Sequence, residues 1–258
     1  MFVKELFDFF DIHFIFFCLV VFVFSATIAS FICLAVERLP HQLKWCDNPI
    51  PGLSIVHPRS FCNNCKQTIS FLYVLPVLGF FFSRGRCSQC KKKIPIKYPL
   101  IEILCGIGSV LIFCYLGVGG KSFFVLFLLW ILLFLTLIDL AEHWLPAVVT
   151  YPLIWLGLMF SPFEPEPIMR IYGGAVCFFI MWLSMKLTSI LKKTDVFAGG
   201  DIALSCAAGA WLGLHLSITM LLISSVVFIL YSIPFRLKNI HWVPMGPALS
   251  IGFMICLF

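Results

Sequence analysis

The chain has 258 residues, of which 61% are hydrophobic and 12% are charged, and its net charge is +6. A soluble globular domain is about half apolar and about one quarter charged, so the composition excludes that class and predicts an all-α polytopic membrane protein. The positive charge does not indicate a nucleic-acid partner, because the cytoplasmic loops of membrane proteins collect Lys and Arg.

The apolar segments predict about eight transmembrane helices, taking about 20 residues as the length that crosses a bilayer. The first has acidic residues before it and no fitting small-residue cleavage site, so we interpret it as a retained span. The predicted spans are residues 14–36, 99–118, 122–140, 145–161, 168–190, 201–215, 217–235 and 243–258. They divide the chain into a first span (1–36), a loop domain (37–98) and a transmembrane core (99–258).

The basic residues predict the orientation of the chain in the membrane. With the N-terminus outside, 15 of the 18 Lys and Arg fall in inside segments, ten of them between Arg38 and Lys97. This agrees with the positive-inside rule and places the loop domain in the cytoplasm. Its apolar stretch FLYVLPVLGFFF (71–82) is too short for a helical span, so we expect it to pack on the membrane surface or to form a small core.

Two cysteine pairs in the loop, Cys62-x2-Cys65 and Cys87-x2-Cys90, are separated by 21 residues. Two such pairs are typical of a tetrahedral structural zinc site. Disulfides are rare in the cytoplasm, and nearby lysines favour thiolates. The alternatives are paired redox cysteines or unliganded thiols. The loop's other cysteine, Cys46, has no predicted role.

Three acidic residues touch apolar runs, namely Glu102, Asp139 and Asp201. Ionisable residues within membrane spans are functional candidates. The topology places Asp139 and Asp201 at the same inside face on different helices, where two close carboxylates share a proton and can activate water. We interpret Glu102 as structural, paired with a basic loop residue, and the nearby His143 as a surface residue.

Small residues surround Asp201. Gly199 and Gly200 allow a sharp turn or a close backbone approach, and Ala203, Ala207 and Ala210 share one helical face against which a neighbouring helix can pack tightly. The alternative role for Asp201 is to cap its helix.

Two other functions compete with a protease. A transporter or channel would use Asp139 and Asp201 as a proton or cation site, but such sites lie near the bilayer midplane, whereas both aspartates lie at span ends. A membrane scaffold would dock partners on its zinc loop and would not need the aspartates.

Six motifs resemble those of the bacterial type IV prepilin peptidases, also called prepilin leader peptidase/N-methyltransferases. They are ASFICLAVERLP (29–40), PRSFCNNC (58–65), SRGRCSQCKKKIPIKYPLIEILCG (83–106), LIDLAEHWLP (137–146), AGGDIALSCAAGAWLG (198–213) and VPMGPALSIG (243–252). The resemblance runs from about residue 25 to the C-terminus.

The resemblance implies an intramembrane aspartic protease of the GxGD type in the bacterial inner membrane, with its active site at the cytoplasmic face. Its substrates would be prepilins or pseudopilins, whose apolar N-terminal helix lies in membrane lipid beside the enzyme. It implies Asp139 and Asp201 as the catalytic pair, and Cys62, Cys65, Cys87 and Cys90 as ligands of one structural zinc ion. It also implies N-methylation of the new terminus with S-adenosylmethionine, for which the sequence shows no glycine-rich fingerprint.

The chain departs from the family pattern near both aspartates. Ala198 replaces the first glycine of GxGD, and Ala203 stands where a lysine is frequent. Ala141 and Ala147 replace acids that often surround the first aspartate. We expect the turn before Asp201 to survive if residue 198 does not need a positive φ.

Overall fold

The computed structural model describes residues 2–46, 48–193, 198–238 and 243–258, with side chains from His13 onward. Within these residues the regular structure is helical, apart from two isolated antiparallel bridges. The prediction of an all-α protein is therefore confirmed. The chain forms two compact units, residues 1–122 and 123–258, while the predicted division at residues 36 and 98 stays a prediction.

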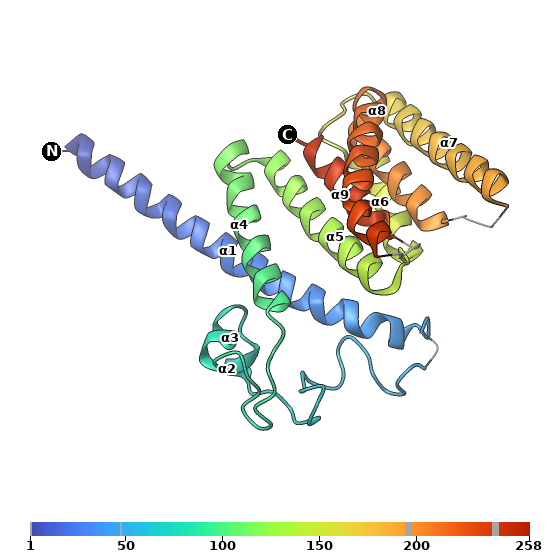
Figure 1. Ribbon diagram of the computed structural model, residues 1–258. Coiled ribbons are helices and arrows are strands. Elements are labelled where there is room, and N and C mark those ends of the chain that lie inside the picture. The colour runs from blue at the N-terminus through green and yellow to red at the C-terminus, as the bar shows by residue number, and fades with distance from the viewer. Residues whose placement is uncertain (1, 47, 194–197, 239–242) are drawn as a thin grey trace. The chain divides into compact units, whose positions relative to one another are not determined.

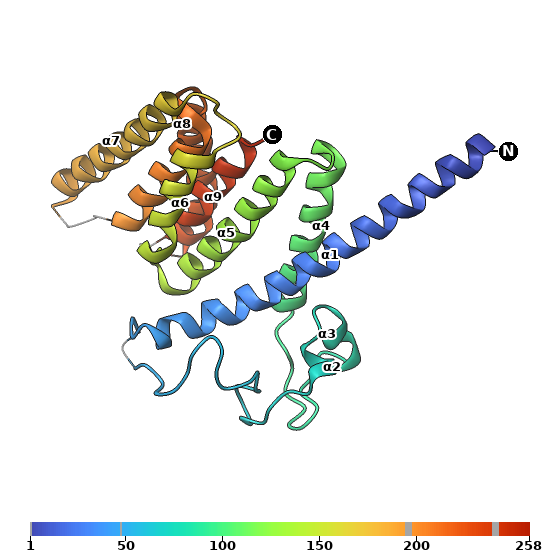
Figure 2. The same ribbon diagram turned by 180° about the vertical axis from the view of Figure 1, so that it is seen from behind.

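The first unit is built on two long helices, α1 (Phe2–Gln42) and α4 (Lys97–Leu116), which cross each other in both views (Figures 1 and 2). Residues later in α1 contact residues earlier in α4, so the two helices are antiparallel. These contacts are the Phe17 ring edge-on to Phe113 at 5.1 Å, the Phe22 ring against Gly106, and a hydrogen bond from the Tyr98 hydroxyl to Glu37.

A buried arginine ties the loop domain to the end of α1. The Arg38 guanidinium donates hydrogen bonds to the carbonyl oxygens of Ser54 at 3.1 Å and Pro58 at 2.6 Å, and it lies over the Phe61 ring. A buried guanidinium needs such acceptors, because an unpaired charge in an apolar environment is strongly unfavourable. The loop therefore has a fixed attachment just before its first cysteine pair.

The apolar stretch 71–82 forms two short helices, α2 (Phe71–Val74) and α3 (Leu78–Phe82). The Val77 backbone N–H donates a 2.7 Å hydrogen bond to Oε2 of the buried Glu102 on α4. Glu102 is thus structural as expected, but this partner is a backbone group rather than the basic side chain we expected. Phe71, Phe81 and most other large side chains of the two helices are exposed, so they do not form a closed core.

The second unit begins at Phe123, inside α5 (Gly120–Glu142). It also contains α6 (Ala147–Phe160), α7 (Pro167–Lys192), α8 (Gly199–Leu237) and α9 (Gly246–Ile255). The helix α8 is interrupted by a kink at Gly213, whose φ of 74° and ψ of 178° are not helical. This backbone conformation favours glycine and divides α8 into two halves. The halves coincide with the separately predicted spans 201–215 and 217–235.

Five described helices are long and apolar enough to cross a membrane, namely α1 from His13, α4, α5, α7 and α8, whereas α6 and α9 are shorter. The chain is therefore a multi-pass membrane protein. The count of eight spans is not confirmed, because only these five of the described helices have the length and hydropathy of a span.

Helices α7 and α8 approach each other through glycine. A Cβ atom added to Gly209 would collide with the backbone of Gly173, and one added to Gly173 would collide with the carbonyl oxygen of Gly209. The three alanines of the predicted small face of α8, Ala203, Ala207 and Ala210, are also buried, and the Ala210 Cβ lies beside Gly174 of α7. Close backbone contact of this kind is a main source of helix association in lipid.

We predict that Gly173→Ala lowers the stability of the protein by about 1–3 kcal/mol, because the added methyl group overpacks two backbones that cannot separate. The matched control is Gly174→Ala, one residue away, where the new Cβ would be 3.4 Å from its nearest neighbour, the Cys206 carbonyl oxygen. Thermal unfolding in detergent measures both. Equal melting temperatures for the two variants would contradict the packing argument.

Candidate active site and metal centre

Asp139 is a buried carboxylate in the last turn of α5, with 4% of its surface exposed. The Gly246 backbone N–H donates a 2.7 Å hydrogen bond to its Oδ2 atom. Gly246 is the first residue of α9, whose N-cap residue Met245 makes no side-chain capping bond. The carboxylate therefore satisfies one of the unpaired N–H groups at this helix start and interacts favourably with the helix dipole.

Asp201 lies in the first turn of α8, partly buried. Helix α8 begins at Gly199 with Ala198 in the N-cap position, so Asp201 is not the capping residue. Ala198 has φ −109°, a value open to any residue, and the alanine substitution in GxGD causes no backbone strain there.

Glycine 200 explains how the two aspartates come together. A Cβ atom at this position would lie 2.7 Å from the Leu145 Cβ and 3.0 Å from the Leu145 carbonyl oxygen. The start of α8 therefore packs directly on the segment that follows α5. Asp201 and Asp139 consequently lie within electrostatic range of each other.

Two further residues lie near the Asp139 carboxylate. His143 is exposed but within electrostatic range of the carboxylate, and Tyr231 is within the same range from the second half of α8. No motif in the sequence indicates a role for Tyr231 or Gly246, because no side-chain pattern marks a backbone donor. Asp201 and Tyr231 are 30 residues apart, which would be roughly 45 Å in a straight helix, so α8 must fold back at Gly213.

The four predicted metal ligands of the first unit lie together. The Sγ atoms of Cys62, Cys65, Cys87 and Cys90, the four-cysteine cluster, are within 4.8 Å of one another. The Cys62–Cys90 and Cys65–Cys87 sulfur pairs are 3.8 and 4.0 Å apart. Tetrahedral Zn–S bonds of about 2.3 Å would place sulfurs roughly 3.8 Å apart, so the cluster can hold a metal ion of this size.

The two halves of the cluster have the same local structure. In each, the residue after the second cysteine donates its N–H to the carbonyl of the first, from Lys66 to Cys62 and from Lys91 to Cys87. Lys66 and Lys91 have the same left-handed conformation, with φ 57° and 58°. Each pair is therefore a tight turn that presents two sulfurs to one point.

Backbone hydrogen bonds change the pKa values of these thiols. The N–H groups of Cys65 and Asn64 lower the pKa of Cys62, and the N–H of Lys92 lowers the pKa of Cys90 to about 6. The Gln67 N–H opposes the shift at Cys65, but desolvation and the neighbouring sulfurs raise its pKa to about 11. Four close sulfurs cannot all ionise without a cation, whereas a metal ion needs thiolates.

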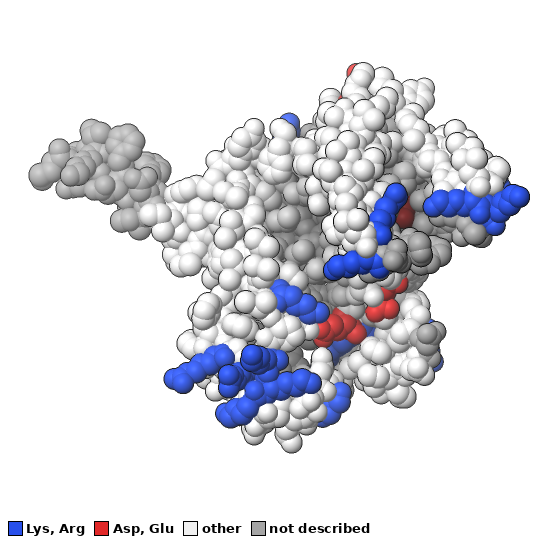
Figure 3. All heavy atoms as spheres, in the orientation of Figure 1, with Lys and Arg blue, Asp and Glu red and all other residues white. Residues whose placement is uncertain are grey.

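The basic residues of the first unit are not spread evenly over its surface. Lys and Arg gather on the part of the first unit that holds the loop domain (Figure 3).

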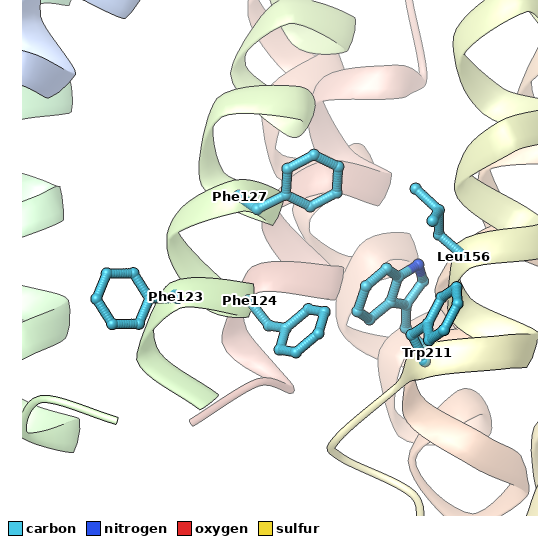
Figure 4. Close-up of a pocket in the computed structure, with 6 residues that line it drawn as sticks. Phe123, Phe124, Phe127, Leu156 and Trp211 are labelled. Carbon is cyan, nitrogen blue, oxygen red and sulfur yellow. The ribbon is translucent and has the colours of Figure 1, made fainter. Parts of the chain in front are cut away.

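In the second unit, Phe124 and Phe127 of α5 and Leu156 of α6 surround Trp211 of α8 in an open apolar pocket of about 420 Å³ (Figure 4). The Trp211 indole N–H donates to the Leu153 carbonyl. This pocket presents no charged group and does not fit S-adenosylmethionine.

Two family models match the chain. One, described as the bacterial peptidase A24 N-terminal domain, matches residues 23–116, and the other, described as the type IV leader peptidase family, matches residues 126–233. No solved structure matches.

Curated relatives match over most of their length. A prepilin leader peptidase/N-methyltransferase from Aeromonas salmonicida is 33% identical over 92% of this chain and 89% of its own. One of the same description from Neisseria gonorrhoeae is 28% identical, covering 89% and 86%. A type 4 prepilin-like proteins leader peptide-processing enzyme from Escherichia coli is 29% identical, covering 87% of each chain. The family models and the 33% identity to a curated relative over most of both chains show that the chain belongs to the type IV leader peptidase family.

Proposed function

We propose that the chain is a membrane aspartic endopeptidase that removes the basic leader from type IV prepilins or pseudopilins, with Asp139 and Asp201 as its catalytic pair. The observation that carries the proposal is the pairing of a buried carboxylate on α5 with a second carboxylate in the first turn of α8. The relatives' descriptions supply the substrate class.

The surroundings of the two carboxylates suggest different roles for them. The Gly246 N–H stabilises the ionised form of Asp139, because hydrogen bonds donated to a carboxylate favour its charge. Asp139 then takes a proton from water, whose oxygen adds to the scissile carbonyl carbon. Asp201 carries the proton that the pair shares and gives it to the carbonyl oxygen. In the collapse of this intermediate, Asp139 gives its proton to the departing amine nitrogen as the C–N bond breaks, and Asp201 takes a proton from a hydroxyl group of the intermediate, which restores both carboxyl groups.

The position of the pair suits a substrate that is itself held in the membrane. Asp139 is three residues before the end of α5 and Asp201 two residues after the start of α8. The basic residues of the loop domain support a cytoplasmic location for these helix ends. A prepilin whose apolar helix lies in the lipid would present its scissile bond at this level, and anchoring both partners supplies proximity.

The four-cysteine cluster is proposed as a structural zinc site. Four thiolates complete a tetrahedral shell and leave no position for substrate, so bound zinc would hold the loop domain together.

Methylation of the new N-terminal residue is proposed from the relatives' description as N-methyltransferases. S-adenosylmethionine would supply the methyl group.

We expect Asp139→Asn and Asp201→Asn each to reduce prepilin cleavage by about 10²-fold or more, because either change removes a proton-transfer group. The assay is cleavage of purified prepilin in detergent or lipid, followed by mass spectrometry. Glu142→Gln is the matched control, since this exposed acid lies three residues beyond Asp139. Full activity in either aspartate variant, with unchanged folding, rules out the catalytic pair.

For the metal centre, metal analysis of the purified protein should find about one zinc per chain. The double variant Cys62→Ser with Cys90→Ser should lose the metal, and limited proteolysis of residues 43–96 should accelerate, because the zinc holds the two turns together. Cys46→Ser is the control, because Cys46 contacts His41 outside the cluster. A zinc-free wild-type protein with a protease-resistant loop is incompatible with the assignment.

Methylation has its own readout. The mature substrate produced with S-adenosylmethionine should be heavier by one methyl group than that produced without it, and the extra mass should map to its first residue. Cleavage itself should not need S-adenosylmethionine, since proton transfer by the two carboxylates completes the hydrolysis. An unmethylated product at saturating S-adenosylmethionine counts against the second activity.

A further inference from the structure

Tyr231 on the second half of α8 has a buried hydroxyl without a hydrogen-bond partner among the described residues. A buried tyrosine hydroxyl normally finds a partner, because an unsatisfied polar group lowers stability. A buried hydroxyl that lacks a hydrogen-bond partner is expected mainly where function requires it. The question is which group this hydroxyl meets when the protein works.

The position of Tyr231 narrows the answer. Gly213 packs against Glu164, in the turn at the far end of α6 from Leu145, so the second half of α8 runs back toward the end of α5. Tyr231 in this half interacts electrostatically with the Asp139 carboxylate, as Asp201 does from the first half. The fold-back at Gly213 therefore brings Tyr231 to the end of the helix bundle where both carboxylates lie. The hydroxyl nevertheless makes no hydrogen bond with either carboxylate, so it remains available to a group of the substrate.

The local packing holds the ring in place. Its centroid is 5.1 Å from that of Phe235, one helical turn further along α8, at an interplanar angle of 56°. Asp139 in turn is held by the Gly246 N–H. A donor fixed in this way before substrate arrives is the arrangement that best stabilises charge developing in a transition state.

We propose that the Tyr231 hydroxyl donates a hydrogen bond to the carbonyl oxygen of the scissile peptide bond and stabilises the negative charge that develops on it. This inference rests on the proposed peptidase function. As the water oxygen bonds to the carbonyl carbon, the π electron pair moves onto the carbonyl oxygen, while Asp139 accepts the water proton. Tyr231 keeps its own proton throughout, and Asp201 delivers the proton that neutralises the intermediate. Tyr231 is thus a catalytic residue that acts by hydrogen bonding.

The test compares Tyr231→Phe with Tyr172→Phe, a matched control at a half-exposed tyrosine of α7. We expect Tyr231→Phe to lower kcat for prepilin cleavage by about 10²-fold, as for loss of one oxyanion donor, and to change KM by less than about threefold. Its melting temperature should equal or exceed that of the wild type, because no hydrogen bond is lost on substitution. Tyr172→Phe should match the wild type in each respect.

A second measurement keeps the proposal falsifiable if Tyr231→Phe folds poorly. A substrate-derived peptide with a tetrahedral hydroxyl group at the scissile position should bind folded Tyr231→Phe about 10²-fold more weakly than wild type, because such analogues use transition-state contacts. Unchanged kcat and unchanged analogue binding, or an effect on KM alone, overturn the role of Tyr231. A wild-type protein that cleaves no prepilin overturns the proposed function itself.

Discussion

The 2.7 Å hydrogen bond from the Gly246 N–H to Asp139 joins parts of the chain 107 residues apart, and the arrangement of the site depends on it. It fixes a carboxylate at the end of α5 and supplies the start of α9 with an acceptor. A buried carboxylate without a donor would be strongly unfavourable. With this donor in place, the first turn of α8 can approach from another side and place Asp201 near Asp139. One backbone group thus connects the helix ends that form the candidate site.

That approach requires small residues, because side chains would otherwise keep the helices apart. Gly200 allows α8 to contact Leu145, and Gly173 with Gly209 allows α7 and α8 to touch backbone to backbone. In lipid the hydrophobic effect does not drive helices together, since acyl chains are as apolar as leucine, and close packing takes its place. The apolar residues of these helices therefore set their place in the membrane, and the glycines set their spacing. Gly213 adds a reversal that returns Tyr231 to the same end of the bundle.

The first unit follows a different physical rule. Its loop domain has few buried apolar side chains, and it is held by polar attachments at defined points, with Arg38 binding loop carbonyls and Glu102 accepting from the Val77 N–H. The four-cysteine cluster would add a third attachment on binding the proposed metal ion. A small loop without its own core needs such connections. The exposed apolar residues of α2 and α3 and the neighbouring basic residues suit a surface facing anionic lipid head groups.

The sequence by itself determined the membrane class, the helical segments, both aspartates and the cysteine spacing, because hydropathy, charge and ligand spacing are local properties of a chain. It also indicated that Ala198 would be tolerated if φ stayed negative, and φ there is −109°. Only the tertiary structure decided that Glu102 binds a backbone N–H, that Gly246 supports Asp139 and that Tyr231 returns to the site. The physical reason is that these contacts depend on which helix faces lie together. An apolar helix surface in lipid does not specify its neighbour, so glycine contacts, a chain reversal and single hydrogen bonds between distant residues make that choice.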